Sequence, residues 1–111
     1  MEKERKWVNK MFVLNTINNN NTLNEIATYE NRDQANRHAC ELREQGYDTY
    51  IYDTPQTKKY RLVTALMFMP KTYATCEHFG KAYEFDNLEW AKNQAEMLNA
   101  VNGTRIRIIE R

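Results

Sequence analysis

The stretch that decides the fold is YRLVTALMFM, residues 60–69, which is the longest run of the chain with few polar side chains and which ends at Pro70. A run of this length is too short to cross a bilayer, because a spanning helix takes about 20 apolar residues. Val63, Thr64 and Phe68 favour a pleated, buried surface. The run therefore predicts a central strand that is apolar on both faces, with the rest of the chain packed around it.

The length of 111 residues indicates a single domain over residues 1–111. The 16 Lys and Arg residues nearly balance the 15 Asp and Glu residues, so charge alone does not imply a polyanionic partner. The opening residues, MEKERKW, are charged, which predicts a cytoplasmic protein without a signal peptide or membrane span. Asn is frequent and Ser is missing, a bias that suggests an AT-rich bacterial or phage genome.

Two helices are predicted between segments that resemble strands. The first helix begins after Asn31, whose side chain can cap it, and ends at Gly46, which tolerates left-handed backbone. The second begins after Asn87 and ends at Gly103 by the same signals. Strands are predicted at residues 11–14, 23–29, 48–53, 60–69, 82–85 and 104–110.

The two helical segments superpose without a gap at an offset of 56 residues. Ala35, Ala39 and Leu42 then match Ala91, Ala95 and Leu98, and Tyr50 and Tyr52 match Ile106 and Ile108. Each half therefore reads as strand, strand, helix, strand, which predicts pseudo-repeats at about residues 8–54 and 58–111. A chance match between two amphipathic helices is the alternative.

The predicted fold class is α+β, with two helices on an antiparallel sheet in a ferredoxin-like βαββαβ arrangement. In that arrangement the strands at 11–14 and 60–69 lie inside the sheet, and those at 48–53 and 104–110 form its edges. The extra strands are either insertions before each helix or members of a larger duplicated sheet. Because helices cover only one face, a hairpin, a second copy of the chain or another partner must cover the other.

Catalytic and metal-binding groups are scarce in the sequence. Nucleophilic catalysis by Ser is excluded, and three glycines do not make a phosphate-binding loop. His38 and Cys40 lie on a helix at i and i+2, about 200° apart, so they cannot hold one metal ion. Cys76 and His78 could pair on a strand, but no third group accompanies them. We therefore expect no enzyme activity, no metal and no cofactor.

The second helix carries an additional apolar line beside its core positions. Trp90, Met97 and Val101 follow one another at i, i+7 and i+11. The matching positions of the first helix are polar, namely Gln34, Glu41 and Gln45. Because Trp and Met are enriched in interface cores, these three residues are the predicted partner-binding site. Burial of Trp90 beneath the segment at residues 71–79 is the alternative.

Basic and aromatic residues mingle at two places, which favours binding of single-stranded nucleic acid as a second hypothesis. These residues are Lys58, Lys59, Tyr60 and Arg61 before the central strand, and Arg105 and Arg107 on one face of the last strand. Phe12 is a further candidate nucleic-acid-binding residue, and its segment MFVLN at residues 11–15 resembles the shorter consensus strand of RNA recognition motifs. The longer consensus strand of that family is absent from this chain.

A second resemblance covers about half of the chain. The first helix, Gly46-Tyr47, the following hairpin and the segment YRLV at residues 60–63 are similar in pattern to SPOR domains, which bind peptidoglycan glycans. The glycine-rich strand ends of that family are missing here, and SPOR domains act after export. The resemblance therefore implies a ferredoxin-like sheet and no glycan-binding residues.

The predicted function is a non-enzymatic, cytoplasmic protein-binding module that acts by occupying the surface of a partner. The partner is another protein or a second copy of the chain in a dimer, and a phage accessory or inhibitor protein is the expected class. Binding of single-stranded nucleic acid through a basic and aromatic sheet face is the alternative. An enzyme or sensor of small molecules would need a buried polar pocket, for which the sequence suggests no residues.

Overall fold

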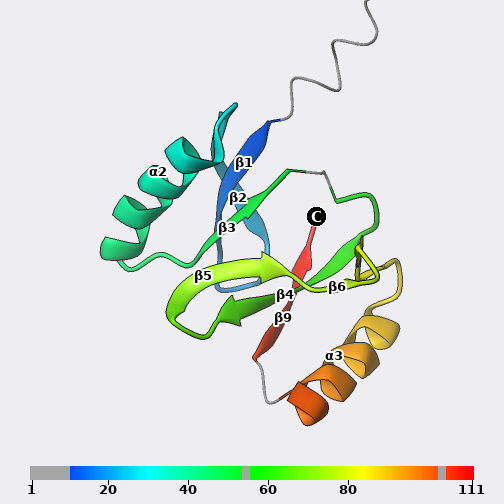
Figure 1. Cartoon of the computed structure of the whole chain (residues 1–111). Coiled ribbons are helices and arrows are strands. Elements are labelled where there is room, and N and C mark those ends of the chain that lie inside the picture. Colours follow the sequence, from blue (N-terminus) through cyan, green and yellow to red (C-terminus); the bar gives the residue numbers. More distant parts are fainter. Residues whose placement is uncertain (1–10, 54–55, 103–104) are drawn as a thin grey trace, which may run out of the picture.

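The computed structural model describes residues 11–53, 56–102 and 105–111 (Figure 1). The charged opening residues and the predicted boundaries at Gly103 and Thr104 lie outside this part. The helices are α2 at Arg32–Glu44 and α3 at Leu88–Asn102. The strands are β1 Phe12–Ile17, β2 Leu23–Tyr29, β3 Thr49–Tyr52, β4 Tyr60–Leu66, β5 Met69–Thr75, β6 Glu77–His78, β7 Lys81–Ala82, β8 Glu84–Phe85 and β9 Ile106–Glu110.

Local sequence signals set the helix boundaries. The Asn31 side chain accepts a hydrogen bond from the backbone N–H of Asp33 at 2.7 Å and caps α2. Asn87 caps α3 in the same way, through the backbone N–H of Glu89 at 2.8 Å. Gly46 follows α2 with a φ of 98°, a left-handed conformation that ends helices and that Gly adopts readily.

Seven strands form one curled sheet in the order β2-β1-β3-β5-β4-β8, and β9 also pairs with β4 (Figure 1). Its strand pairs are antiparallel except β3–β5, which is parallel and limited to Thr49 with Thr72 and Tyr50 with Tyr73. We call this two-pair contact the seam. The fold is therefore α+β, with two helices and a mostly antiparallel sheet.

The two halves of the chain share part of their strand pairing on either side of the seam, and the second half also contains β6, β7 and β8. In the first half β1 lies between β2 and β3, and in the second half β4 lies between β5 and β9. The sheet curls until Thr22, which precedes β2, forms a parallel bridge with Glu110 of β9. The backbone N–H of Glu110 also donates to the carbonyl of Asn21 at 2.9 Å. The halves therefore meet at the seam and again at this bridge.

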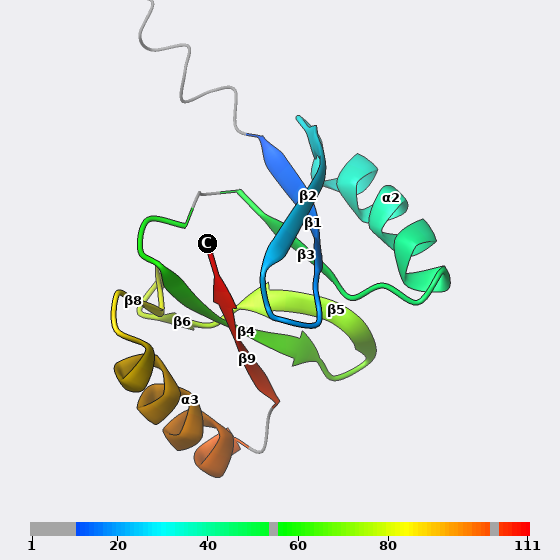
Figure 2. The same cartoon turned by 180° about the vertical axis from the view of Figure 1, so that it is seen from behind.

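Two apolar clusters stabilise the fold. The first joins both halves and contains one buried residue from each of five strands, namely Ile17, Tyr50, Val63, Tyr73 and Ile109. The second lies beneath α3 and is built on Leu62, Ala91 and Ala95. The helix α2 buries Ala35 and Ala39 and contacts β1, β2 and β3. Figure 2 shows the two helices at opposite ends of the sheet, each against its own half.

The predicted central strand is shorter than the apolar run. Leu62 and Val63 are both fully buried, so the middle of the strand is apolar on both faces. However, β4 ends at Leu66, and Met67 and Phe68 form the turn into β5. The prediction of one strand over residues 60–69 was wrong because a turn made of apolar residues lacks the Gly, Asn or Asp that usually marks one.

The sheet does not have the ferredoxin-like strand order. In that order β1 and β4 would be neighbours, whereas β1 pairs with β2 and β3, and β4 pairs with β5, β8 and β9. The strand β3, predicted as an edge, lies between β1 and β5, and its Thr49 and Tyr50 are only 1% exposed. The predicted strand at 23–29 pairs into the sheet as β2, whereas the one predicted at 82–85 divides between β7, which pairs with β6 in a separate hairpin, and β8, which pairs with β4. The strand β5, which joins the halves, was not predicted.

The offset of 56 residues fits the helices but not the strands that follow them. Ala35 and Ala39 are buried, as are Ala91 and Ala95 at the matching positions. Tyr50, however, belongs to the cluster that joins the halves, whereas Ile106 packs in the cluster beneath α3. Side chains alternate between the two faces of a strand, so a shift of one residue moves a side chain to the opposite face. The repeat without gaps is therefore not confirmed beyond the helices.

Candidate functional site

The predicted partner-binding residues lie on the solvent side of α3. Trp90 is 66% exposed, Met97 61% and Val101 80%, and a helix places these positions within about 40° of one another around its axis. We call these three residues the α3 stripe. Because Trp90 is exposed, it does not pack beneath residues 71–79, and that alternative was wrong.

Two hairpin tips add further exposed apolar side chains. Met67 and Phe68, in the turn between β4 and β5, are 85% and 91% exposed. Phe79, in the turn between β6 and β7, is 92% exposed and has a φ of 52°. A positive φ is uncommon for a residue other than Gly, Asn or Asp. The apolar run predicts residues 67–68 in a strand, and no local pattern marks Phe79 as an exposed residue.

A charged network lies in the interior between the two halves. Arg61 is 3% exposed, and its Nε donates to Glu84 Oε2 at 2.9 Å. A second guanidinium nitrogen of Arg61 donates to the hydroxyl of Tyr50 at 2.9 Å. Glu84 also accepts from the hydroxyl of Thr57 at 2.6 Å. Arg61 is therefore both buried and paired, whereas the nucleic-acid hypothesis requires it on a solvent-exposed face of the sheet.

The other residues of the nucleic-acid hypothesis are placed in separate groups. Arg107 donates to Asp48 at 2.7 Å and to Asn21 at 2.9 Å. Lys59 lies 3.7 Å from Glu110 and 5.6 Å from the ring of its neighbour Tyr60. The charges of Arg107 and Lys59 are therefore engaged by this chain's own acidic residues.

The remaining residues of this hypothesis form no ion pair with the part of the chain that the structure describes. Lys58 and Arg105 are both exposed; Lys58 precedes β4 and Arg105 precedes β9. Phe12 lies in the first half, where its ring contacts the guanidinium of Arg32 at 4.8 Å. The structure therefore does not bring the basic and aromatic residues onto one unpaired surface.

The His and Cys residues are dispersed. The Tyr29 hydroxyl and His38 Nδ1 are 2.6 Å apart, and Cys40 is exposed on the same helix as His38. Burial raises the pKa of the Cys76 thiol to about 11, which keeps it protonated near neutral pH. Within the described residues no group of three or more His, Cys, Asp or Glu could hold a metal ion.

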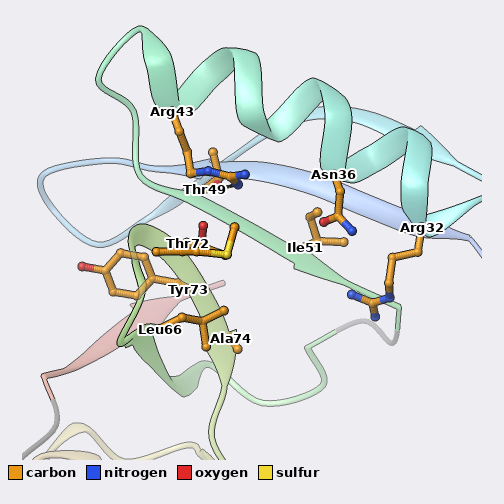
Figure 3. A pocket seen from close by; sticks show the side chains of 10 residues that line it. Arg32, Asn36, Arg43, Thr49, Ile51, Leu66, Thr72, Tyr73 and Ala74 are labelled. Carbon is orange, nitrogen blue, oxygen red and sulfur yellow. Dashed lines mark hydrogen bonds between the residues drawn. The ribbon is translucent and has the colours of Figure 1, made fainter.

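Two hollows flank the place where β3 and β5 cease to pair. A groove of about 390 Å³ lies between α2 and the strands, and Arg32 and Arg43 stand at its two ends (Figure 3). A more polar hollow of about 330 Å³ is lined by Arg61, Asp53 and Glu77 among others. Neither hollow was anticipated from the sequence, because each combines residues from both halves of the chain.

No family model, curated protein or solved structure matches this chain. In the part of the chain that the structure describes, no helix is both long enough and apolar enough to cross a membrane.

The pKa of Glu84 is lowered, and this makes folding stability depend on pH. Burial by itself would raise the pKa of this carboxyl, but hydrogen bonds from Thr57 and Arg61 and the positive charge of Arg61 outweigh that effect. A carboxylate with a lowered pKa contributes stability above its unfolded pKa, about 4.3 for Glu, and loses it as the pH falls through the folded pKa.

We expect acid to weaken the wild-type protein more steeply than the Glu84→Gln variant. Urea midpoints measured from about pH 7 down to about pH 3 would test this, because the amide that replaces the carboxyl in the variant cannot titrate in that range. Glu77→Gln is the matched control, since Glu77 is exposed on β6. Parallel curves for the wild type and Glu84→Gln would contradict the prediction.

Proposed function

We propose that this protein is a non-enzymatic binding module that docks the α3 stripe into an apolar groove on another protein. The observation that carries the proposal is the exposure of Trp90, Met97 and Val101 along one line of a helix. Helices that bind in grooves present anchors at i, i+4, i+7 and i+11, and Gln94 completes that spacing between Trp90 and Met97. The apolar side chains supply the hydrophobic contact, and Gln94 supplies one polar contact within it.

A groove on a different protein fits the stripe better than a second copy of the chain does. Stable protein interfaces bury about 800 Å² on each partner. In a dimer, the α3 stripe of one copy would contact only the α3 stripe of the other. Three side chains on each copy would bury much less than that area. A concave partner encloses the helix and also contacts its flanks, so it buries more surface per residue. Occupation of such a groove is how an accessory or inhibitor protein acting in the cytoplasm would work.

Substitutions in the α3 stripe should abolish partner binding without unfolding the protein. We expect Trp90→Ala and Met97→Ala each to weaken binding at least about tenfold, because buried Trp and Met anchors dominate interface energies. The folded fraction should not change, because both side chains are largely exposed and the Asn87 cap bonds only backbone N–H groups. Gln34→Ala and Glu41→Ala, at the matching positions of α2, are the control variants.

The experiment places a photo-crosslinking residue at position 97, and at position 41 as the control. A protein that is crosslinked only from position 97 is then purified, and its affinity for wild type and variants is measured by calorimetry. Sedimentation of the isolated protein gives its mass. A dimer that depends on Trp90 would replace the proposed partner with a second copy. Equal affinity for wild type and Trp90→Ala would overturn the proposal.

We also infer that the chain arose by duplication of a strand, strand, helix, strand unit. The partly shared strand pairing of the two halves supports this inference, as do the buried alanines at matching positions of α2 and α3. Divergence of the two copies would account for the polar flank on α2 and the apolar flank on α3. Only the second copy would then have acquired the surface proposed to bind a partner.

A further inference from the structure

The groove beside α2 has a charge pattern that the α3 stripe lacks. Arg32 lies in the first turn of α2 and Arg43 in the last, and both line the groove. No Asp or Glu is found among the described residues that line it. The described lining of the groove therefore carries a positive charge at each end and no acidic residue, and Arg32 also lines the polar hollow that contains Asp53 and Glu77.

Both arginine side chains are held at the groove by contacts that leave guanidinium N–H groups free to bind. The Arg43 guanidinium donates to the Thr49 hydroxyl at 3.2 Å, and Thr49 itself is 1% exposed and donates to the carbonyl of Lys71 at 3.1 Å. The Arg32 guanidinium lies 4.8 Å from the centre of the Phe12 ring. A guanidinium carries five N–H donors, so one hydrogen bond or a ring contact leaves others for a carboxylate.

The middle of the groove is apolar with two polar groups. Its apolar lining comes from Ile51, Leu66, Met69 and Ala74. Figure 3 shows Asn36 of α2 above this lining, and Thr72 of β5 across from it. The Thr72 hydroxyl oxygen is buried and has no hydrogen-bond partner among the residues that the structure describes. The Asn36 amide can pair with a peptide backbone, whereas the Thr72 hydroxyl oxygen is closed off from solvent.

The length of the groove identifies the ligand class. Arg32 and Arg43 are separated along the helix by about 16 Å, at about 1.5 Å per residue. An extended peptide advances about 3.3 Å per residue, so the first and last Cα atoms of five residues lie about 13 Å apart, and Glu side chains at both ends can reach the rest of that distance. A peptide segment of that length with a carboxylate near each end can contact both arginines. We propose that this groove binds an extended acidic peptide segment with a carboxylate near each end and an apolar side chain between them.

The proposal is independent of the α3 stripe, because α2 and α3 lie at opposite ends of the sheet (Figure 2). It gives the protein a second contact surface, which could bind the same partner or a different one. Trp90→Ala should therefore leave peptide binding unchanged. Failure of the peptide test would remove the groove as a binding site and would not affect the function proposed for α3.

The test uses a fluorescent library of five-residue peptides with Glu at the first and fifth positions and Leu, Ile, Met or Phe at the third. Binding to the full chain is followed by anisotropy at low salt. We expect Arg32→Gln and Arg43→Gln each to weaken binding about tenfold, because each removes a charge-assisted contact. Arg37→Gln is the matched control, since Arg37 is exposed on the same helix and does not line the groove.

Three results would overturn the proposal. The first is equal binding of peptides that carry Gln in place of Glu. The second is a loss in Arg37→Gln as large as that in Arg32→Gln, which would indicate attraction by total charge alone. The third is a single-stranded oligonucleotide that displaces the peptide and binds more tightly through the same two arginines, which would assign the groove to nucleic acid.

Discussion

Replacing Arg61 by Met is expected to cost about 3–5 kcal/mol of folding free energy, the range for breaking a buried ion pair by removing one partner. Met retains an unbranched side chain but removes the guanidinium that bonds Glu84 and Tyr50. The Glu84 side chain is 12% exposed, so its carboxylate would remain in the interior without that cation. Because proteins of this size are stable by about 5–15 kcal/mol, a large part of the total would be lost.

Urea denaturation of the variant measures this loss, and Lys59→Met supplies the control. Lys59 pairs with Glu110 at 3.7 Å, but the two side chains are 53% and 42% exposed, so we expect that control to lose less than about 1 kcal/mol. Adding Glu84→Gln to Arg61→Met should restore part of the stability, because the unpaired charge is removed. Equal losses in Arg61→Met and Lys59→Met would contradict the assignment of a stabilising network.

Shortening Leu62 to Ala should destabilise the protein by about 2–5 kcal/mol, because it removes a fully buried side chain and leaves a cavity beneath α3. Leu62 packs in one cluster with Ala91 and Ala95, which are too small to fill the space by moving. Thermal or urea unfolding monitored by circular dichroism measures the change.

The control for this substitution lies on the same strand. Leu66 is at the end of β4 and is 39% exposed, so Leu66→Ala should cost less than about 1 kcal/mol. The two variants delete the same atoms and differ only in the burial of the site. If both cost the same, the middle of the apolar run would not be the buried part of the strand, and the described packing under α3 would be wrong.

The sequence predicted those features that depend on neighbouring residues. Asn31, Asn87 and Gly46 set helix ends through contacts within a few residues, and the structure has those ends. The fold class follows from the same local signals. The line through Trp90 was also visible as a helical period, and the structure shows that no other described segment covers it.

The features that the sequence did not predict depend on residues far apart in the chain. The order of the strands depends on which strand edges pair with each other. The pairing of β3 with β5 involves only two residue pairs, so no sequence pattern of useful length marks it. The Arg61 network joins residues 50, 57, 61 and 84, which no local pattern connects. The groove likewise needs α2 from one half and β5 from the other, so its two arginines looked like ordinary charges on a helix surface.

The narrow seam has a mechanical consequence. Beyond Tyr50 and Tyr73 the two strands no longer pair, and Ile51 and Ala74, the next residues on each, line both hollows. Two residue pairs make a much shorter ladder than those within each half. The halves are therefore held together mainly by side chains, in the five-strand cluster and through the bond from Arg61 to Tyr50, and by the bridge of Thr22 with Glu110.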